Sequence, residues 1–254
     1  MYPILGQLGG FTVYAYGFFV AAGFAAGFAL VIRAARNNGI PSGTVVDLFF
    51  YTLLSSILGS RVLYVLTNFD FFLENPAKIV NLREGGLVFY GGLLLAAGVT
   101  LGYIKRHRLP VWKVADLFFP PVALGLFFGR IGCFFAGCCY GKETDLPWGV
   151  VFTNPQSLAR LNVPLHPTQL YDAANGLALF IVLIWLERRK TFEGQVFWFF
   201  IFLYSVTRFL IEALRGDPRG SFLGSALSTS QGIGIVLAMA SLFMLFYLKR
   251  RSRR

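Results

Sequence analysis

Two ionisable residues and a tyrosine recur at helical spacing in one apolar segment of the chain. Tyr204, Arg208 and Glu212 follow one another at intervals of four residues, so they lie along one face of a helix. A guanidinium group stays ionised when partly desolvated and binds phosphate through paired donors. Because an ionisable residue inside a long apolar segment is a candidate functional residue by default, the triplet indicates a site for a phosphate-bearing anion. Arg208 and Glu212 could instead serve only to neutralise one another.

Further polar side chains occur where other apolar segments begin or end. The motif GRIG at residues 129–132 ends one segment, and HPTQLYD at residues 166–172 opens another. The candidates from these and two earlier segments are Tyr16, Tyr90, Arg130, His166, Gln169 and Tyr171. Some have a plainer interpretation: Arg130 could anchor its helix at the membrane interface, Tyr16 could belong to an interfacial aromatic belt, and His166 could be an ordinary loop residue.

These residues are embedded in a very apolar chain. Of its 254 residues, 56% are hydrophobic and 14% are charged, compared with about 25% charged in an average soluble domain. The apolar residues form seven blocks, each long enough to cross a hydrocarbon core of about 30 Å as a helix. The blocks are residues 13–32, 45–65, 87–104, 114–135, 170–186, 196–214 and 232–248. A soluble helical protein would need a polar face on most of them, so we predict an all-α integral membrane protein with seven transmembrane helices.

Basic residues predict how these helices are oriented. They concentrate in the connections at 105–113 and 187–190 and in the terminal run 249–254, which share one side of the membrane if the seven helices alternate. Under the positive-inside rule this side is cytoplasmic, so the N-terminus lies outside and the C-terminus inside. The net charge of +11 follows mainly from this bias, with the terminal run meeting anionic membrane lipids, and needs no nucleic-acid partner.

This orientation brings the candidate side chains to one depth. Five of the predicted helices contribute polar groups near the outer leaflet, and the middle of the membrane holds few. A proton or ion pathway needs polar groups through the whole thickness, so a transporter is disfavoured. The pattern favours a cavity at the outer leaflet that binds an anionic lipid head group. We predict a single domain over residues 1–254, in which residues 137–167 form a small outer cap with a short strand near 149–153.

All three cysteines of the chain, Cys133, Cys138 and Cys139, follow the GRIG arginine closely. Their spacing lacks the C-x2-C pattern of zinc sites and no histidine is near in sequence, so zinc is disfavoured and neither a metal nor a cofactor is predicted. A disulfide between Cys133 and one of the other two is one alternative on an oxidising side of the membrane. Packing beside a lipid cavity is the favoured interpretation, and a redox or acyl-carrier role is a third.

The motifs together resemble the prolipoprotein diacylglyceryl transferase family. The resemblance rests on GSRVLYVLTNFDFFLENP, GGLVFYGG, GRIG, HPTQLYD, the Tyr204–Arg208–Glu212 triplet and STSQG before the last apolar block, and it spans nearly the whole chain. It implies a multi-pass enzyme of the bacterial cytoplasmic (inner) membrane with its active site at the outer leaflet. Such an enzyme transfers the diacylglyceryl group of phosphatidylglycerol to the lipobox cysteine of a preprolipoprotein, and forms a thioether and glycerol 1-phosphate.

The resemblance also implies roles for individual residues. Arg130 and Arg208 match arginines that hold the lipid phosphate, and a base must deprotonate the acceptor thiol. The expected catalytic residues are Arg130, Arg208, Glu212, His166 and Tyr90. The expected substrate-binding residues are Tyr16, Arg130, Tyr204, Arg208, Gln169 and Tyr171.

The chain departs from the family pattern at four positions. Cys133, Ala136 and Cys138 stand where the family has two asparagines and a glutamate, and Tyr90 stands at a histidine position. These differences keep two alternatives open. One is a related membrane enzyme that uses a different lipid donor or acceptor, and the other is a lipid-binding membrane protein without catalysis.

Overall fold

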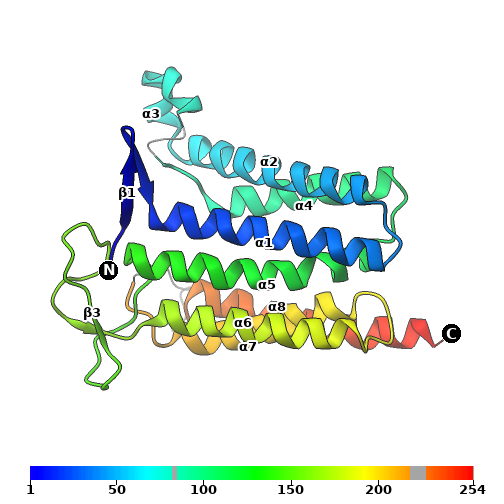
Figure 1. The fold of residues 1–254 in the computed structure, drawn as a ribbon. Coiled ribbons are helices and arrows are strands. Elements are labelled where there is room, and N and C mark those ends of the chain that lie inside the picture. The colour runs from blue at the N-terminus through cyan, green and yellow to red at the C-terminus, as the bar shows by residue number, and fades with distance from the viewer. Residues whose placement is uncertain (82–84, 218–226, 254) are drawn as a thin grey trace. The chain divides into compact units, whose positions relative to one another are not determined.

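The computed structural model describes residues 1–81, 85–217 and 227–253, and these form helices joined by short strands and loops (Figure 1). The elements in chain order are β1 (Ile4–Leu8), β2 (Phe11–Tyr14), α1 (Ala15–Asn37), α2 (Ser42–Thr67), α3 (Phe69–Glu74), the 3-10 helix η1 (Pro76–Val80), α4 (Phe89–Arg106), α5 (Val111–Ala136), β3 (Val150–Val151), β4 (Pro164–Leu165), α6 (Thr168–Glu187), α7 (Gln195–Glu212) and α8 (Thr229–Ser252). They build two compact units, one of residues 1–31 with 115–254 and one of residues 32–114.

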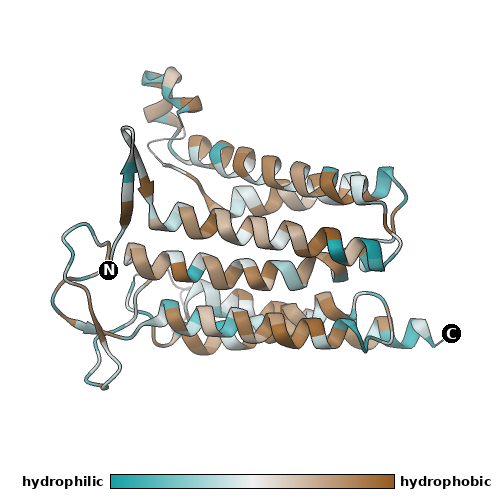
Figure 2. Ribbon diagram, viewed as in Figure 1, coloured by the Kyte–Doolittle hydropathy of each residue, from teal (hydrophilic) through white to brown (hydrophobic). Residues whose placement is uncertain are grey.

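A helix stands at each of the seven predicted apolar blocks. Six of them, α1, α2, α5, α6, α7 and α8, are long and apolar enough to cross a membrane. α4 is not among the six because its 18 residues end in Lys105 and Arg106, which lower its mean hydropathy. Apolar residues run along the helices, and hydrophilic ones gather in loops and at the end of α8 (Figure 2). The prediction of an all-helical integral membrane protein agrees with this structure.

The first unit is held together by an apolar core between α5, α6 and α7. Its buried members are Ala123, Leu179, Leu183, Leu186, Val196 and Phe200. The start of α7 is fixed to α5 by a fully buried carboxylate: Asp116 accepts hydrogen bonds from the backbone N–H groups of Gly194 and Phe197, at 2.8 and 2.9 Å. A carboxylate at a helix N-terminus satisfies donors that the helix leaves open. This contact therefore sets the position of the helix that carries Arg208.

The predicted short strand near 149–153 is present as β3, two residues long. β3 pairs antiparallel with β4, with Val150 opposite Leu165 and Val151 opposite Pro164. The Asn154 side chain that follows donates to the carbonyl of Met1 at 3.1 Å, so the N-terminus and this loop lie at the same end of the first unit (Figure 1). The C-terminus lies at the opposite end of the unit's helices.

Backbone hydrogen bonds connect three loop segments near this end: the one after α5, the one before α6 and the one after α7. Gly141 N–H donates to the His166 carbonyl, and Lys142 N–H donates to the Leu214 carbonyl, at 3.0 and 2.8 Å. Gly216 N–H donates to the Tyr140 carbonyl at 3.2 Å. A Cβ atom on Gly141 would lie only 2.5 Å from the His166 Cβ, so glycine is needed for this close approach. These hydrogen bonds join the segment after the cysteines to the start of α6 and to the segment after α7.

In the second unit, α2 and α4 pack against each other through glycines. A Cβ on Gly59 would lie 2.3 Å from the carbonyl oxygen of Gly91, and a Cβ on Gly91 would lie equally close to that of Gly59. The Thr52 and Thr100 hydroxyls hydrogen-bond across the same pair of helices at 2.7 Å. Small residues that let helix backbones approach closely are typical of packing between membrane helices.

Arg61 in α2 organises the loop between α2 and α4. Arg61 is 9% exposed, and its guanidinium group donates to backbone carbonyls of that loop. The acceptors, at 2.6 to 3.1 Å, are the carbonyls of Lys78, Ile79, Asn81, Gly85 and Gly86. All the donor groups of Arg61 are thereby used inside the protein, so this cation is structural.

We expect Arg61→Met to loosen this loop without unfolding the helices. Each lost hydrogen bond to the charged group contributes about 1.5–3 kcal/mol, so residues 76–81 should exchange their amide protons faster in hydrogen-exchange mass spectrometry. Lys78→Met is the matched control, because it removes a cation from the same loop. The Lys78 ammonium group lies over the Phe71 ring and donates to none of these carbonyls. Equal exchange in the two variants would contradict the role given to Arg61.

Candidate functional site

Three arginine side chains converge on one buried carboxylate in the first unit. They are Arg130 from α5, Arg208 from α7 and Arg215 just beyond α7. Each directs Nη1 toward Oδ2 of Asp172 in α6, at 3.3, 3.5 and 3.8 Å respectively. The Asp172 side chain is only 2% exposed. One buried negative charge is therefore shared by three cations that come from separate parts of the chain.

Glu212, the last residue of α7, is the second carboxylate of this cluster. It forms an ion pair with Arg208 one turn earlier, and its Oε2 lies 4.0 Å from Arg215 Nε. Its other oxygen accepts a hydrogen bond from the Ser228 hydroxyl at 3.1 Å. Ser228 also caps α8, where its side chain and that of Gln231 form a capping box. Arg208 and Glu212 thus make the pair that their spacing allows, and Glu212 ties α7 to the start of α8.

The arginines keep hydrogen-bond donors that the described part of the chain does not use. Nη1 of Arg208 and Nη1 of Arg215 are buried and lack an acceptor within the described residues. At 3.5 and 3.8 Å they attract the Asp172 carboxylate without donating a hydrogen bond to it. Buried donors without acceptors destabilise a fold. Phosphate oxygens would accept from these two donors, so the cluster has the composition of an anion site.

Arg215 links this cluster to a polar pocket. Its Nε and Nη2 donate to the two carboxylate oxygens of Asp217 at 2.8 and 2.9 Å. Burial alone would lower the pKa of Arg215, but hydrogen bonds to Asp217 and Cys139 raise it above its ordinary value, so this side chain remains a cation. The adjoining pocket has a volume of about 410 Å³, and Lys142 and Arg160 also line it. Glu143 and Asp217 line it as well and pair with Arg160 and Arg215, so the pocket carries charges of both signs.

His166 and Tyr171 form a second group near the start of α6. His166 Nδ1 lies 3.3 Å from the Tyr171 hydroxyl, which in turn accepts a hydrogen bond from Trp148 Nε1 at 2.9 Å. The imidazole is therefore oriented by a phenol whose own position is set by the cap loop. Such a group can take up a proton, because neutral imidazole has one ring nitrogen free to accept.

The other predicted residues lie in different surroundings. The Tyr204 phenol is within electrostatic range of Arg130 and Arg208, and Tyr16 is within range of Arg130 and all three cysteines. Gln169 is fully buried, and its Nε2 donates to the carbonyl of Cys138 at 2.8 Å. Tyr90 belongs to the second unit, where it is the second residue of α4 and half exposed.

The three cysteines carry thiols rather than disulfides, and their sulfur atoms gather in one place. The Sγ atoms of Cys133, Cys138 and Cys139 all lie within 4.8 Å of one another. Cys139 has φ 62°, a left-handed conformation that few non-glycine residues adopt. The Thr168 hydroxyl donates a hydrogen bond to the carbonyl of Cys139 at 2.9 Å. The turn after α5 thus brings the sulfur of Cys133 close to those of Cys138 and Cys139, which follow it by five and six residues in sequence.

Sequence reasoning gave no role to two members of the arginine cluster, Asp172 and Arg215, although Asp172 ends the HPTQLYD motif. A signal for each was present. Asp172 is the only acidic residue in the predicted block 170–186, so its charge requires a buried partner. Arg215 follows Glu212 by three residues, which continues the face of Arg208 and Glu212 beyond the end of the helix.

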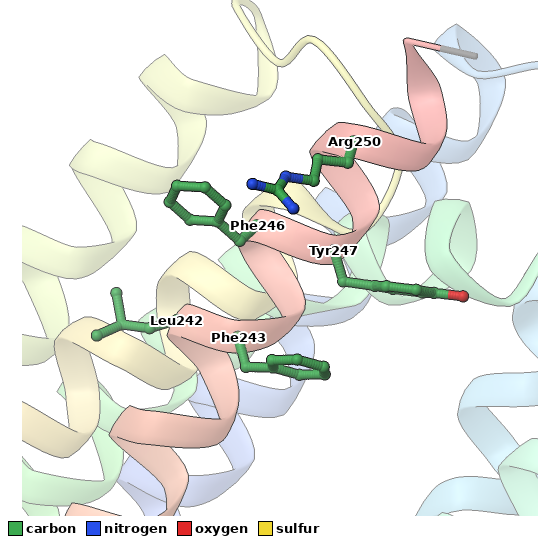
Figure 3. Close-up of a pocket in the computed structure, with 5 residues that line it drawn as sticks. All are labelled: Leu242, Phe243, Phe246, Tyr247 and Arg250. Carbon is green, nitrogen blue, oxygen red and sulfur yellow. The ribbon is translucent and has the colours of Figure 1, made fainter.

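A hollow of about 440 Å³ on α8 has a different character. It is lined by Leu242, Phe243, Phe246, Tyr247 and Arg250, all from this one helix (Figure 3). Phe243 and Phe246 are each 68% exposed, and the Arg250 guanidinium lies over the Phe246 ring at 5.6 Å. Arg250 and the Tyr247 hydroxyl are the polar groups of this lining and the rest is apolar, so this face fits contact with lipid chains better than chemistry.

Comparison with known proteins relates nearly the whole chain to one family. A family model described as prolipoprotein diacylglyceryl transferase matches residues 3–247. The phosphatidylglycerol–prolipoprotein diacylglyceryl transferase of Clostridium tetani is 38% identical over 244 residues, which cover 96% of each chain. The protein of Clostridium perfringens that carries this name with the number 2 is 34% identical over 252 residues, covering 99% of this chain and 97% of its own. The relative from Geobacter sulfurreducens is 36% identical over 256 residues, with 98% and 96% covered.

Proposed function

The chain belongs to the prolipoprotein diacylglyceryl transferase family, and on that premise we propose that it transfers the diacylglyceryl group of phosphatidylglycerol to the lipobox cysteine thiol of preprolipoproteins. The reaction forms a thioether and releases glycerol 1-phosphate. The observation that supports this function best is the cluster of three arginines with two buried, unused Nη1 donors. A lipid phosphate supplies the oxygens that those donors lack.

Arg130 and Arg208 hold the phosphate of the donor lipid in this proposal, and Arg215 supports them from the pocket side. The acceptor sulfur displaces a phosphate ester at the glyceryl carbon, so negative charge on the leaving phosphate rises as the bond breaks. Preorganised guanidinium groups stabilise such developing charge. Tyr16 and Tyr204 are within electrostatic range of Arg130, and we propose that they shape the head-group site.

The acceptor must react as a thiolate, and a cysteine thiol has an ordinary pKa of about 8.5. His166, Glu212 and Tyr90 are the proposed proton acceptors. Both carboxylate oxygens of Glu212 are already engaged, one by Arg208 and the other by the Ser228 hydroxyl. Among the described residues, His166 Nδ1 pairs with the Tyr171 phenol and with no charged group, so His166 is the favoured acceptor of the thiol proton.

We expect His166→Ala to lower the transfer rate by about 10²- to 10⁴-fold, the usual contribution of a positioned general base. Tyr171→Phe should have a smaller effect, because it removes the hydroxyl that orients the ring and leaves the imidazole in place. The measurement is the initial rate of transfer to a lipobox peptide between pH 6 and 9 (about the range in which histidine and thiol titrate). If Tyr90→Phe rather than His166→Ala abolishes transfer, the base is Tyr90.

We propose that the chain crosses the inner membrane seven times, with α4 as the seventh span, N-terminus outside and C-terminus inside, and with the arginine site at the outer leaflet. Residues 1–254 then form a single membrane domain with residues 137–167 as an outer cap. Lys249, Arg250 and Arg251 in the last turn of α8 support a cytoplasmic C-terminus.

This topology predicts the activity of alkaline phosphatase fusions, since that enzyme folds only outside the cytoplasm. Fusions after Arg108 and after Lys190 should be inactive, and a fusion after Gly149 should be active. An inverted pattern would contradict the orientation. If the N-terminus is outside and α4 does not cross, the same inversion results, so a fusion after Gly39, between α1 and α2, separates the two: it stays inactive in this case and becomes active if the orientation is inverted.

Complementation of a transferase-depleted bacterium tests the function as a whole, with the mobility shift of a lipoprotein as readout. The purified protein in nanodiscs should then transfer lipid from phosphatidylglycerol to a lipobox peptide. Transfer from a different phospholipid only would favour an enzyme with another donor. Binding of phosphatidylglycerol without any transfer would favour the non-catalytic alternative.

A further inference from the structure

We propose that Cys133, Cys138 and Cys139 bind one Zn²⁺ ion through three thiolates and leave its fourth coordination position for the acceptor thiol of the preprolipoprotein. This inference rests on the proposed function, because it assigns the activation of that thiol to a metal. Three protein ligands with one open position are the arrangement of catalytic zinc sites, whereas structural sites are closed by four.

The sulfur geometry fits this ion. Zinc binds thiolate at about 2.3 Å, so the sulfurs of a tetrahedral site lie roughly 3.8 Å apart. The three Sγ atoms are already within 4.8 Å of one another, and small rotations of the side chains close the difference. Within the described residues, no histidine or carboxylate joins the three sulfurs. The protein therefore offers three ligands here, and the fourth position is left to a substrate.

The backbone around the cysteines holds this arrangement before any metal binds. Cys133 lies in the last turn of α5, where its carbonyl accepts from Gly137 N–H at 2.9 Å. Gly137, at φ 80°, and Cys139, at φ 62°, then reverse the chain back over Cys133. Thr168 and Gln169, both fully buried, hold the carbonyls of Cys139 and Cys138 at 2.9 and 2.8 Å. A strained turn fixed by buried side chains is typical of a functional site.

The sulfur cluster adjoins the arginines proposed to hold the lipid phosphate. Arg215 hydrogen-bonds to the Cys139 sulfur, and Arg130 is within electrostatic range of Cys133 and Cys139. Zinc with three thiolates carries one net negative charge, which these guanidinium groups offset. Cys133 is 9% exposed, whereas Cys138 and Cys139 are half-buried, so a ligand can reach the metal from their side. An acceptor sulfur on this zinc would lie beside the anion site.

The chemistry of such a site matches the reaction. A thiol that binds zinc loses its proton at neutral pH, and here that proton passes to His166 or to water. The zinc-bound sulfur then uses an electron pair to form the bond to the glyceryl carbon, and the bond from that carbon to the phosphate oxygen breaks. The leaving electron pair stays on the phosphate, which departs as glycerol 1-phosphate. The neutral thioether is a poor zinc ligand and leaves the metal, so the ion is unchanged and nothing is oxidised.

Metal content is the first test, and it does not depend on activity. The full chain, purified in nanodiscs without chelators, should hold one zinc per protein by mass spectrometry of metals. Cys133→Ser, Cys138→Ser and Cys139→Ser should each lower that content at least tenfold. His107→Gln is the matched control: it removes the chain's other histidine, which lies in the second unit, and should leave the zinc in place. Equal zinc content in all four variants, or none in the unmodified protein loaded with Zn²⁺, would overturn the site.

Cobalt substitution tests the open position in the unmodified protein, so it does not require a variant to fold. Co²⁺ in place of zinc should give a tetrahedral visible spectrum with sulfur charge-transfer bands, and a lipobox peptide with a free thiol should intensify those bands. The same peptide with serine in place of cysteine should leave them unchanged. An identical response to both peptides would overturn the role of the fourth position.

The activity of the chelated enzyme separates this inference from the proposed function. Removal of zinc should lower transfer at least 100-fold, and added Zn²⁺ should restore it. Full transfer by the zinc-free protein would overturn the catalytic role of the metal and leave the proposed function intact. A protein that binds zinc and shows the cobalt response without transferring lipid would support the metal site and count against the proposed function.

Discussion

Replacing Arg208 by alanine is expected to lower the rate of lipid transfer by at least about 10²–10³-fold, as the loss of one preorganised charge-stabilising donor does in other active sites. Arg208 has a buried Nη1 without an acceptor in the described part of the chain, 3.5 Å from Asp172. Loss of this donor removes stabilisation of the leaving phosphate. Arg208→Lys should recover only a small part of the rate, because an ammonium group keeps the charge but not the forked donors.

The matched control for Arg208→Ala is Arg160→Ala. Arg160 also forms an ion pair with a glutamate, Glu143, at 3.0 Å, but both side chains are more than half exposed. An exposed pair contributes about 0–1 kcal/mol, so this variant should transfer lipid at the unmodified rate. Initial rates at several phosphatidylglycerol concentrations separate weaker binding of the lipid from slower chemistry.

A double substitution tests whether Arg208 only neutralises Glu212. Arg208→Gln and Glu212→Gln together remove both buried charges of the pair, so no uncompensated carboxylate remains. If mutual neutralisation is the sole role of Arg208, the double variant should transfer lipid normally. We expect it to fold and to remain inactive. Transfer by Arg208→Ala at the unmodified rate would contradict the phosphate role altogether.

The helices were predictable because hydropathy along the chain reports burial in lipid directly. All seven apolar blocks are helical, and the differences are confined to the ends. α1 continues to Asn37, five residues beyond its predicted block, because polar and basic residues extend a helix past the hydrocarbon edge. The strand near 149–153 was predictable from its flanking turn residues, although pairing with β4 shortens it to Val150–Val151.

The site was predictable only where its residues share one element. Arg208 and Glu212 sit one turn apart, so helical spacing alone indicated them. Asp172 and Arg215 join them through contacts between α6 and the loop after α7, and a single sequence carries no information on which helix faces lie against each other. The gathering of the three cysteine sulfurs was not predictable for a related reason. Cys139 takes a left-handed conformation that folds the chain back, and the spacing of the cysteines in sequence does not report it.

Replacing Asp172 is expected to affect stability rather than the transfer rate, because its carboxylate is the negative charge that the three arginines share when no ligand is bound. Asp172→Asn keeps the shape of the side chain and removes its charge, so three guanidinium groups remain close together with less compensation. Breaking a buried ion-pair network in this way destabilises a protein by about 3–5 kcal/mol. The variant in phosphatidylcholine nanodiscs should therefore unfold at a clearly lower temperature than the unmodified protein. Glu143→Gln, which breaks the exposed pair with Arg160, should unfold at an unchanged temperature.

The lipid dependence of this loss distinguishes an anion site from a merely structural network. A ligand that binds the folded state stabilises it in proportion to its affinity. If the arginines bind the phosphate of phosphatidylglycerol, that lipid should raise the unfolding temperature of Asp172→Asn more than that of the unmodified protein, because its phosphate takes the place of the missing carboxylate. The thermal shift between phosphatidylcholine and phosphatidylglycerol nanodiscs is the measurement, with Glu143→Gln as reference. If the network is only structural, the shift in unfolding temperature should be equal in the three proteins, since no arginine donor would then bind a lipid phosphate.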